Sequence, residues 1–287
     1  MSATAFALVA ASVLCHATWN LLSKRAAVAG TVFVAVWSVV AALLWAPLGI
    51  WALVTGWDAL GWGSLVLVGG AALLHTGYYL LLQRGYAVGD LSVVYPVARG
   101  LGPVLICAVA VPFFDEDPGL LGWAGTLALS VSVALIGKPS PDSLKRRAPI
   151  MYALATGVFI AAYTLWDRNA VAVAALSPIL VNWGGDTGRA LLLTPWLIKH
   201  RARAKQVWRE HRREVFGTAI CSPGAYMLAL TAMTMAPVTV VAPLREVSVL
   251  LVVFLGARLL GERDMWRRLV AALGVVAGAV GVTLGRG

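Results

Sequence analysis

Long apolar stretches alternate with short polar ones along the whole chain. Apolar segments of spanning length fall at ten places: 3–22, 31–54, 62–83, 92–113, 119–137, 150–167, 174–198, 215–236, 238–257 and 267–284. A helix needs about 20 apolar residues to cross a hydrocarbon core of about 30 Å. The pattern therefore predicts an all-α integral membrane protein with ten transmembrane helices.

The chain also resembles itself once, at an offset of 147 residues and without a gap. The matching pairs include Trp19 and Trp166, Gly77 and Gly224, Tyr79 and Tyr226, and Pro96 and Pro243. The offset divides the ten segments into five and five, and predicts a first repeat over 1–145 and a second over 148–287. Because five is odd, the second repeat enters the membrane inverted, which is an arrangement typical of transporters.

Basic residues agree with an inverted repeat. Of 23 Lys and Arg residues, 18 fall in loops on one predicted side of the membrane, two on the other, and three inside spans. By the positive-inside rule the 18 are cytoplasmic, which places both termini outside a cytoplasmic (inner) membrane. Seven of them crowd into residues 199–213. A patch for anionic lipid or nucleic acid is the alternative interpretation of that segment, and topology is favoured.

Composition excludes a soluble protein. The chain is 60% hydrophobic and 13% charged, and its mean hydropathy is +0.82. Three cysteines and four histidines form no pairing or metal-ligand motif, so we expect no cofactor and no metal. A secretory signal peptide is not predicted, because the first apolar stretch begins at Ala3 without a basic segment before it.

Charged residues inside the predicted spans are the first candidates for function. An ionisable group at mid-membrane costs about 2.5–3.5 kcal/mol on insertion scales. Arg99 follows Pro96, and Arg245 and Glu246 follow Pro243. The offset makes Glu246 the equivalent of Arg99. Either these charges line a central cavity and bind substrate, or Arg99 and Glu246 form a structural ion pair. The two prolines are predicted hinges.

Other polar residues of the spans are candidates of a second rank. Asp186 lies three residues before Arg189, so the two can neutralise each other, although Asp186 stays a candidate for gating or proton coupling. His16 and Trp19 share one helix face, and Tyr163 and Trp166 are their equivalents. Weaker candidates for a cavity are His75, Tyr78, Tyr79 and Tyr226. For Trp166 with Asp167, an aromatic belt at the membrane interface is the favoured interpretation.

The chain resembles the EamA-type family of the drug/metabolite transporter superfamily over its whole length. Tyr95-Pro96-Val97-Ala98-Arg99-Gly100, Gly261-Glu262, Asp115-Glu116-Asp117 and the stretch from His16 to Asn20 carry the resemblance. It implies ten short helices around a central substrate cavity. By position it supports a cavity location for His16, Trp19, Tyr79, Arg99, Tyr226, Arg245 and Glu246, and we expect these residues and Tyr95 to bind substrate.

We therefore expect a transporter that moves a small amphipathic metabolite, amino-acid-like or otherwise zwitterionic or anionic, by alternating access and in the direction of export. Coupling, if there is any, is expected to be to protons. A flippase for a lipid-linked or phosphorylated head group, and a membrane sensor or scaffold without transport, are the alternatives. An enzyme is not expected, because no catalytic motif is found. The expected partners are a small-molecule substrate and the bilayer but no nucleic acid, and a monomer is slightly favoured.

Overall fold

A computed structural model describes residues 1–26, 29–57, 60–88, 91–136, 147–248, 250–251 and 265–285. Within these ranges the structure is helical and contains no strand. The first half contributes α1 (Ala3–Arg25), α2 (Gly30–Leu44), α3 (Ala46–Thr55), α4 (Trp62–Val88), α5 (Leu91–Phe114) and α6 (Gly119–Ile136). The second half contributes α8 (Arg147–Arg168), the π-helical η3 (Asn169–Val173), α9 (Pro178–Lys199), α10 (Arg201–Met233), α11 (Val238–Arg245) and α13 (Met265–Leu284).

The length and apolarity of several helices suit a bilayer. Five described helices can cross a membrane, or six if the bent pair α2 and α3 is one span. The predicted number of ten is thus not established on the described residues. One reason is that α9 carries Asp186 and Arg189 in its interior, which lowers its apolarity. Another is that the predicted span 238–257 falls partly outside the residues described.

Two predicted elements differ from the structure. The predicted span 31–54 is bent by 54° between α2 and α3, where Pro47 lies in the first turn of α3. Proline lacks the N–H that would continue the preceding helix, so a bend at this point has a local cause. The basic stretch 199–213, predicted as a loop, is mostly helical. It forms the beginning of α10 and ends in a kink at His211.

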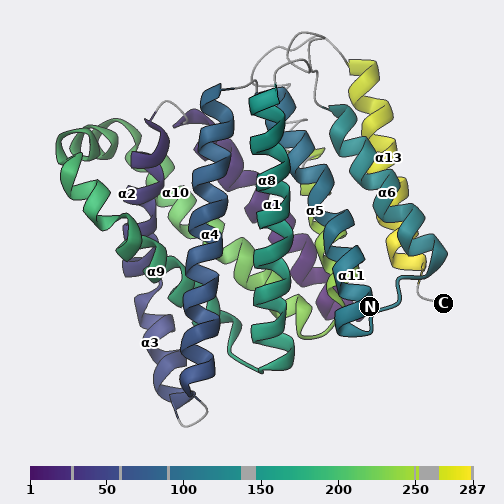
Figure 1. Ribbon diagram of the computed structural model, residues 1–287, viewed down its shortest axis with the longest axis horizontal. Coiled ribbons are helices and arrows are strands. Elements are labelled where there is room, and N and C mark those ends of the chain that lie inside the picture. Colours follow the sequence, from purple (N-terminus) through teal and green to yellow (C-terminus); the bar gives the residue numbers. More distant parts are fainter. Residues whose placement is uncertain are drawn as a thin grey trace.

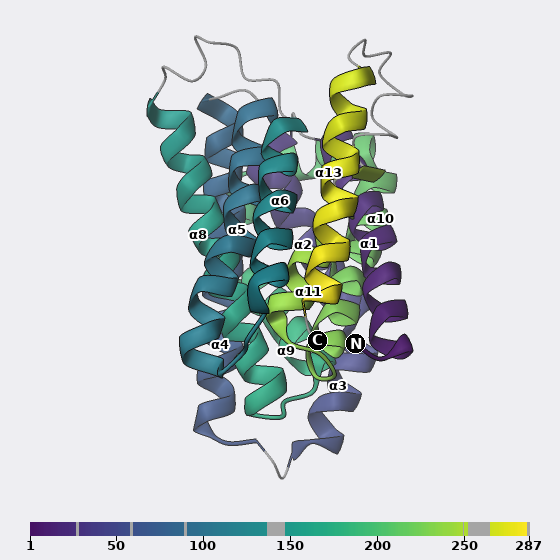
Figure 2. The same cartoon turned by 90° about the vertical axis from the view of Figure 1, so that its right-hand side faces the viewer.

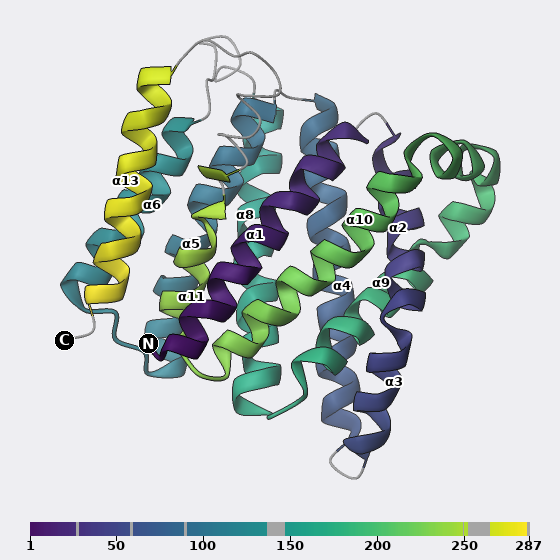
Figure 3. The same cartoon turned by 180° about the vertical axis from the view of Figure 1, so that it is seen from behind.

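Pairs of packed helices in the structure correspond to one another under the 147-residue offset. α1 packs along α10, and their equivalents α8 and α4 also pack together. In the same way α4 packs on α9, and α10 packs on α2. Figures 1 and 3 show these pairs from opposite sides, with α1 and α10 side by side in Figure 3. The division into two inverted repeats stays a prediction, with which this exchange of partners agrees.

Three tryptophans fasten neighbouring helices to one another. The indole Nε1 of Trp45 donates to the Ala219 carbonyl in α10 over 2.9 Å. Trp166 donates to Leu67 in α4 over 2.8 Å, and Trp183 donates to Ala42 in α2 over 2.9 Å. Each of these part-buried indole N–H groups gains a partner that hydrocarbon cannot supply. These bonds hold α2, α4, α8, α9 and α10 in register around the centre of the bundle.

The two ends of the bundle differ in charge. The N-terminus and the end of α13 lie at one end, and the basic junction of α9 and α10 lies at the other (Figures 1 and 2). Both termini on one side is what the predicted topology requires. Which end faces the cytoplasm stays a prediction from the basic residues.

Candidate functional site

A buried cavity lies at the centre of the bundle, between helices of both halves. Its wall comes from α1, α4, α5, α8, α9, α10 and α11. The polar and aromatic residues of the wall are His16, Trp19, His75, Tyr78, Tyr79, Arg99, Tyr163, Asp167, Asn182, Asp186, Arg189, Ser222, Tyr226 and Arg245. The space left for water-sized molecules is about 40 Å³. A single water needs about 10–15 Å³ on this measure, so the space has room for a few waters.

Arg99 is the hub of one cluster in this wall. Its Nη1 donates to Oε1 of Glu246 over 3.1 Å, and its Nη2 lies 2.6 Å from Nε2 of His16. All three residues are buried, and α5 holds Arg99 between α1 and the end of α11. Glu246 itself does not belong to the lining of the cavity, and its Oε2 has no hydrogen-bond partner among the described residues. The predicted pair thus exists, with the arginine facing the cavity and the carboxylate behind it.

The geometry of His16 restricts its protonation. Besides Arg99 at Nε2, the indole Nε1 of Trp19 lies 3.2 Å from Nδ1. Arginine and tryptophan are donors only, and a neutral imidazole has one acceptor nitrogen. One of the two contacts is therefore a hydrogen bond and the other is a close approach. A doubly protonated His16 would point an N–H at a donor on each side, so His16 can take up a proton only if Arg99 or Trp19 moves.

Arg189 and Asp186 form a second cluster, in which both oxygens of Asp186 and two nitrogens of Arg189 have hydrogen-bond partners. Arg189 Nη2 donates to Asp186 Oδ1 over 2.6 Å, and Arg189 Nε donates to Ser38 Oγ over 2.9 Å. The guanidinium also lies 4.5 Å from the Trp37 ring centroid. Asn182 donates to the second oxygen of Asp186 over 3.3 Å. This cluster ties α9 to α2, and the two residues neutralise each other as their spacing predicts.

Asp167 is the centre of a third cluster. Its Oδ2 accepts a hydrogen bond from Tyr226 Oη over 2.7 Å and lies 2.8 Å from His75 Nε2. Its Oδ1 has no hydrogen-bond partner among the described residues, although the side chain is only 1% exposed. α8, α4 and α10 supply one residue each. A buried carboxylate oxygen without a donor is costly.

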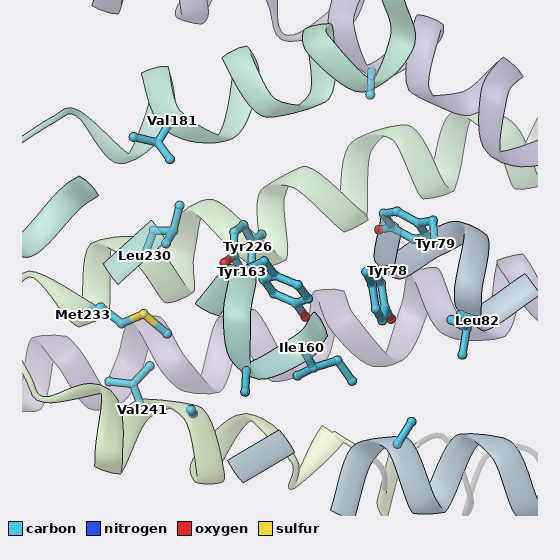
Figure 4. Close-up of a cluster of buried hydrophobic side chains, with 14 of the residues drawn as sticks. Tyr78, Tyr79, Leu82, Ile160, Tyr163, Val181, Tyr226, Leu230, Met233 and Val241 are labelled. Carbon is cyan, nitrogen blue, oxygen red and sulfur yellow. The ribbon is translucent and has the colours of Figure 1, made fainter. Parts of the chain in front are cut away.

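Aromatic rings cover the wall between these clusters. Tyr163 packs edge to face on Tyr226 at 5.8 Å and on Tyr78 at 5.3 Å between centroids. His75 lies 4.2 Å from Tyr163. Figure 4 shows Tyr163 next to Tyr226, with Tyr78 and Tyr79 on the neighbouring α4. The guanidinium of Arg245 lies 5.1 Å from the centroid of Tyr226, and its Nε has no hydrogen-bond partner among the described residues.

The cavity brings together most of the site residues predicted from the sequence. Its wall contains His16, Trp19, Tyr79, Arg99, Tyr226, Arg245 and Asp186, while Glu246 reaches it through Arg99. Their role in binding stays a prediction. The side chains of Tyr95 and Pro96 and the motif Gly261-Glu262 lie outside the described residues. α5 runs on from Leu91 to Phe114 without a break, whereas α11 ends at Arg245, two residues after Pro243.

Asp167 was not among the substrate-binding residues predicted from the sequence. The favoured interpretation placed it with Trp166 in an aromatic belt at the membrane interface, but the structure buries it in the cavity wall. One feature of the sequence could have indicated its role. Asp167 is the equivalent of Asn20, the last residue of the stretch from His16 to Asn20 that carries the family resemblance. His75 and Tyr78, weaker candidates in the sequence, also line the cavity. Among the described residues no group of three or more His, Cys, Asp or Glu side chains could hold a metal ion.

Two comparisons with known proteins found a match, one to a family over the second half of the chain and one to a solved structure over nearly all of it. Residues 147–284 match the model of the EamA-like transporter family. A solved crystal structure aligns over 99% of this chain and 98% of its own, with a TM-score of 0.77 and 16% sequence identity. At that identity the likeness shows the fold alone. No curated protein matches the chain.

Proposed function

We propose that this chain, which belongs to the EamA-like transporter family by the match of residues 147–284, moves a small amphipathic metabolite through its central cavity. A membrane transporter in general follows from the family. The proposal adds the cargo, an amino-acid-like or otherwise zwitterionic or anionic organic compound, and the mechanism, alternating access between two inverted repeats. It also adds the direction, export across the cytoplasmic membrane.

The observation that carries the proposal is the mixed chemistry of the buried cavity. Charged side chains inside a membrane protein are costly and mark pathways for polar solutes. Here three arginines, Arg99, Arg189 and Arg245, line a cavity whose wall also contains two carboxylates, four tyrosines and two histidines. Such a wall offers charge to the polar end of a metabolite and aromatic surface to its apolar end.

The small free volume of the cavity supports alternating access. A space of about 40 Å³ cannot hold an organic metabolite, so the helices must separate before the cargo enters. The helix pairs exchanged by the offset are the natural units of such a movement, because each half packs on the other through equivalent contacts. The end of α11, two residues after Pro243, is a point at which the chain can bend.

The experiment is a thermal-shift screen of the purified protein against amino acids, amines, organic acids and phosphorylated metabolites, followed by flux into proteoliposomes. Arg99→Ala is tested in parallel. We expect one chemical class to raise the melting temperature, the same class to be transported, and both effects to be lost in the variant. Stabilisation by phosphorylated compounds alone would favour a flippase. Binding without flux of any compound would contradict the transporter.

A further inference from the structure

The charges at the cavity divide into those that are paired and those that are not. The wall and the layer directly behind it contain three arginines and three carboxylates: Arg99, Arg189, Arg245, Asp167, Asp186 and Glu246. Arg99 pairs with Glu246 and Arg189 with Asp186. Within the described part of the chain, Arg245 and Asp167 have no such arginine–carboxylate partner, and Asp167 instead contacts His75 at 2.8 Å. Among the described residues they form no ion pair with each other, and Arg245 forms none with any other carboxylate.

Both remaining charges contact the same side chain. Asp167 accepts a hydrogen bond from the hydroxyl of Tyr226, and the guanidinium of Arg245 lies over the Tyr226 ring. A negative and a positive group thus lie at different parts of one tyrosine, and both face the cavity. A zwitterionic molecule next to Tyr226 could satisfy the two at once, since an ammonium suits a carboxylate and a carboxylate suits an arginine.

The surroundings of Asp167 suit a cation. One oxygen is held by Tyr226 and His75, which fixes the orientation of the carboxylate, and the other oxygen has no donor among the described residues. With a proton on Nε2, His75 donates an N–H to this oxygen, as Tyr226 does through its hydroxyl. The rings of Tyr163 and Tyr226 lie next to His75 at 4.2 and 5.1 Å. Aromatic faces around a carboxylate form a site for an amine cation.

We propose that Asp167 binds a protonated amine of the cargo through its Oδ1, while Arg245 receives the anionic end. The cargo is then a compound with an ammonium group, and plain organic anions are excluded. This inference rests on the proposed function and narrows it. The alternative is that Asp167 only anchors Tyr226 and His75 between α10, α8 and α4.

The test compares three matched compounds that share one apolar group: leucine, its deaminated acid 4-methylpentanoate, and its decarboxylated amine 3-methylbutylamine. The same set is built on phenylalanine. Thermal shift gives affinity, and proteoliposome flux gives transport. The variants are Asp167→Asn, which keeps the size and an acceptor for Tyr226, and Asp115→Asn as the control. Asp115 is an exposed carboxylate outside the cavity in the left-handed backbone conformation (φ 53°), which asparagine tolerates well.

For the unchanged protein we expect the amino acid to bind best, the amine less tightly, and the deaminated acid not at all. In Asp167→Asn the affinity for the amino acid and the amine should fall about ten- to a hundredfold, the worth of a hydrogen bond to a buried charge. Asp115→Asn should bind like the unchanged protein.

Other outcomes overturn the inference in distinguishable ways. Equal binding of the deaminated acid and the amino acid would show that the amine is not recognised, with the transporter left standing. A loss in Asp167→Asn that is equal for all three compounds would assign Asp167 to structure alone. No binding and no flux of any member of either set would contradict the proposed cargo itself. If Asp167→Asn fails to fold, the comparison of the three compounds on the unchanged protein still decides, and Asp167→Glu, which keeps the charge, should retain the preference for the amine.

Discussion

Arg189 and Arg245 are both buried and both face the central cavity, but they differ in their partners. Arg189 donates to Asp186 and to Ser38 and lies against two aromatic rings. Arg245 lies over Tyr226, and its Nε has no hydrogen-bond partner among the described residues. A buried arginine whose donors are satisfied locks helices together. One with a donor to spare can receive a ligand. Burial alone, therefore, does not tell structure from binding.

Removal of the satisfied arginine should have the largest effect on stability. Arg189→Ala leaves Asp186 buried without its cation and Ser38 without its donor, and we expect a loss of about 3–5 kcal/mol in the free energy of unfolding. Thermal unfolding in detergent measures it. The double variant Arg189→Ala/Asp186→Asn should recover part of the loss, because no unpaired charge is left. Normal stability of the single variant would show that the ion pair does not hold α9 on α2.

The pair between Arg99 and Glu246 is an intermediate case, because Arg99 is ion-paired like Arg189, whereas one oxygen of its partner Glu246 has no hydrogen-bond partner among the described residues. Arg99→Ala or Glu246→Ala should each cost about 3 kcal/mol of stability by leaving a buried charge alone. The double variant Arg99→Leu/Glu246→Leu should recover stability but not transport. Full flux through that double variant would rule out substrate contact by either residue and leave the pair a purely structural role.

Glu116 extends the comparison to a satisfied carboxylate at one end of the bundle. It accepts hydrogen bonds from the backbone N–H groups of Val238 and Thr239 at the start of α11, and from Arg168 over 3.2 Å. Glu116→Gln removes the charge from this helix start and from the ion pair, and we expect a loss of about 1–2 kcal/mol. Thermal unfolding is the measurement, and Asp117→Asn in the same turn is the matched control. Since Glu116 is outside the cavity, a changed cargo preference in Glu116→Gln would contradict a structural role.

The sequence could predict the part of the site that follows the repeat. Arg99 and Glu246 are separated by 147 residues, which is the offset itself, so residues equivalent by the repeat meet at the centre. The cluster around Asp167 could not be predicted in this way. It joins α4, α8 and α10 through Asp167, His75 and Tyr226, and two of these have no like partner under the offset, since Asp167 corresponds to Asn20 and His75 to Ser222. Its formation depends on how three helices are rotated, and the hydrophobic pattern does not contain that information.

The hydrophobic pattern was also an incomplete guide to the helices. The apolar pattern located the helices, because length and hydropathy decide what can enter a bilayer. It missed the helical start of α10 at Arg201, since a helix at the end of a bundle can be polar all round when it does not cross the membrane. It also missed the 54° bend before α3, although Pro47 was visible in the sequence. Proline is common in membrane helices and bends only some of them.

Removal of the arginine with a donor to spare should have the smallest effect on stability and a large effect on transport. Arg245→Ala loses a contact between a cation and a ring but leaves no carboxylate unpaired among the described residues, so we expect a loss below about 1 kcal/mol. Flux and binding of a zwitterionic cargo should fall at least about tenfold, because the anionic end loses its partner. Arg245→Lys keeps the charge but lacks the planar guanidinium, so its flux and binding should lie between those of the unchanged protein and those of Arg245→Ala. If Arg245→Ala instead unfolds the protein as Arg189→Ala is expected to, both arginines are structural and the anionic end of the cargo binds elsewhere. If it leaves stability and flux unchanged, the spare donor of Arg245 has no part in binding, and only the side of the cavity around Asp167 remains to recognise the cargo.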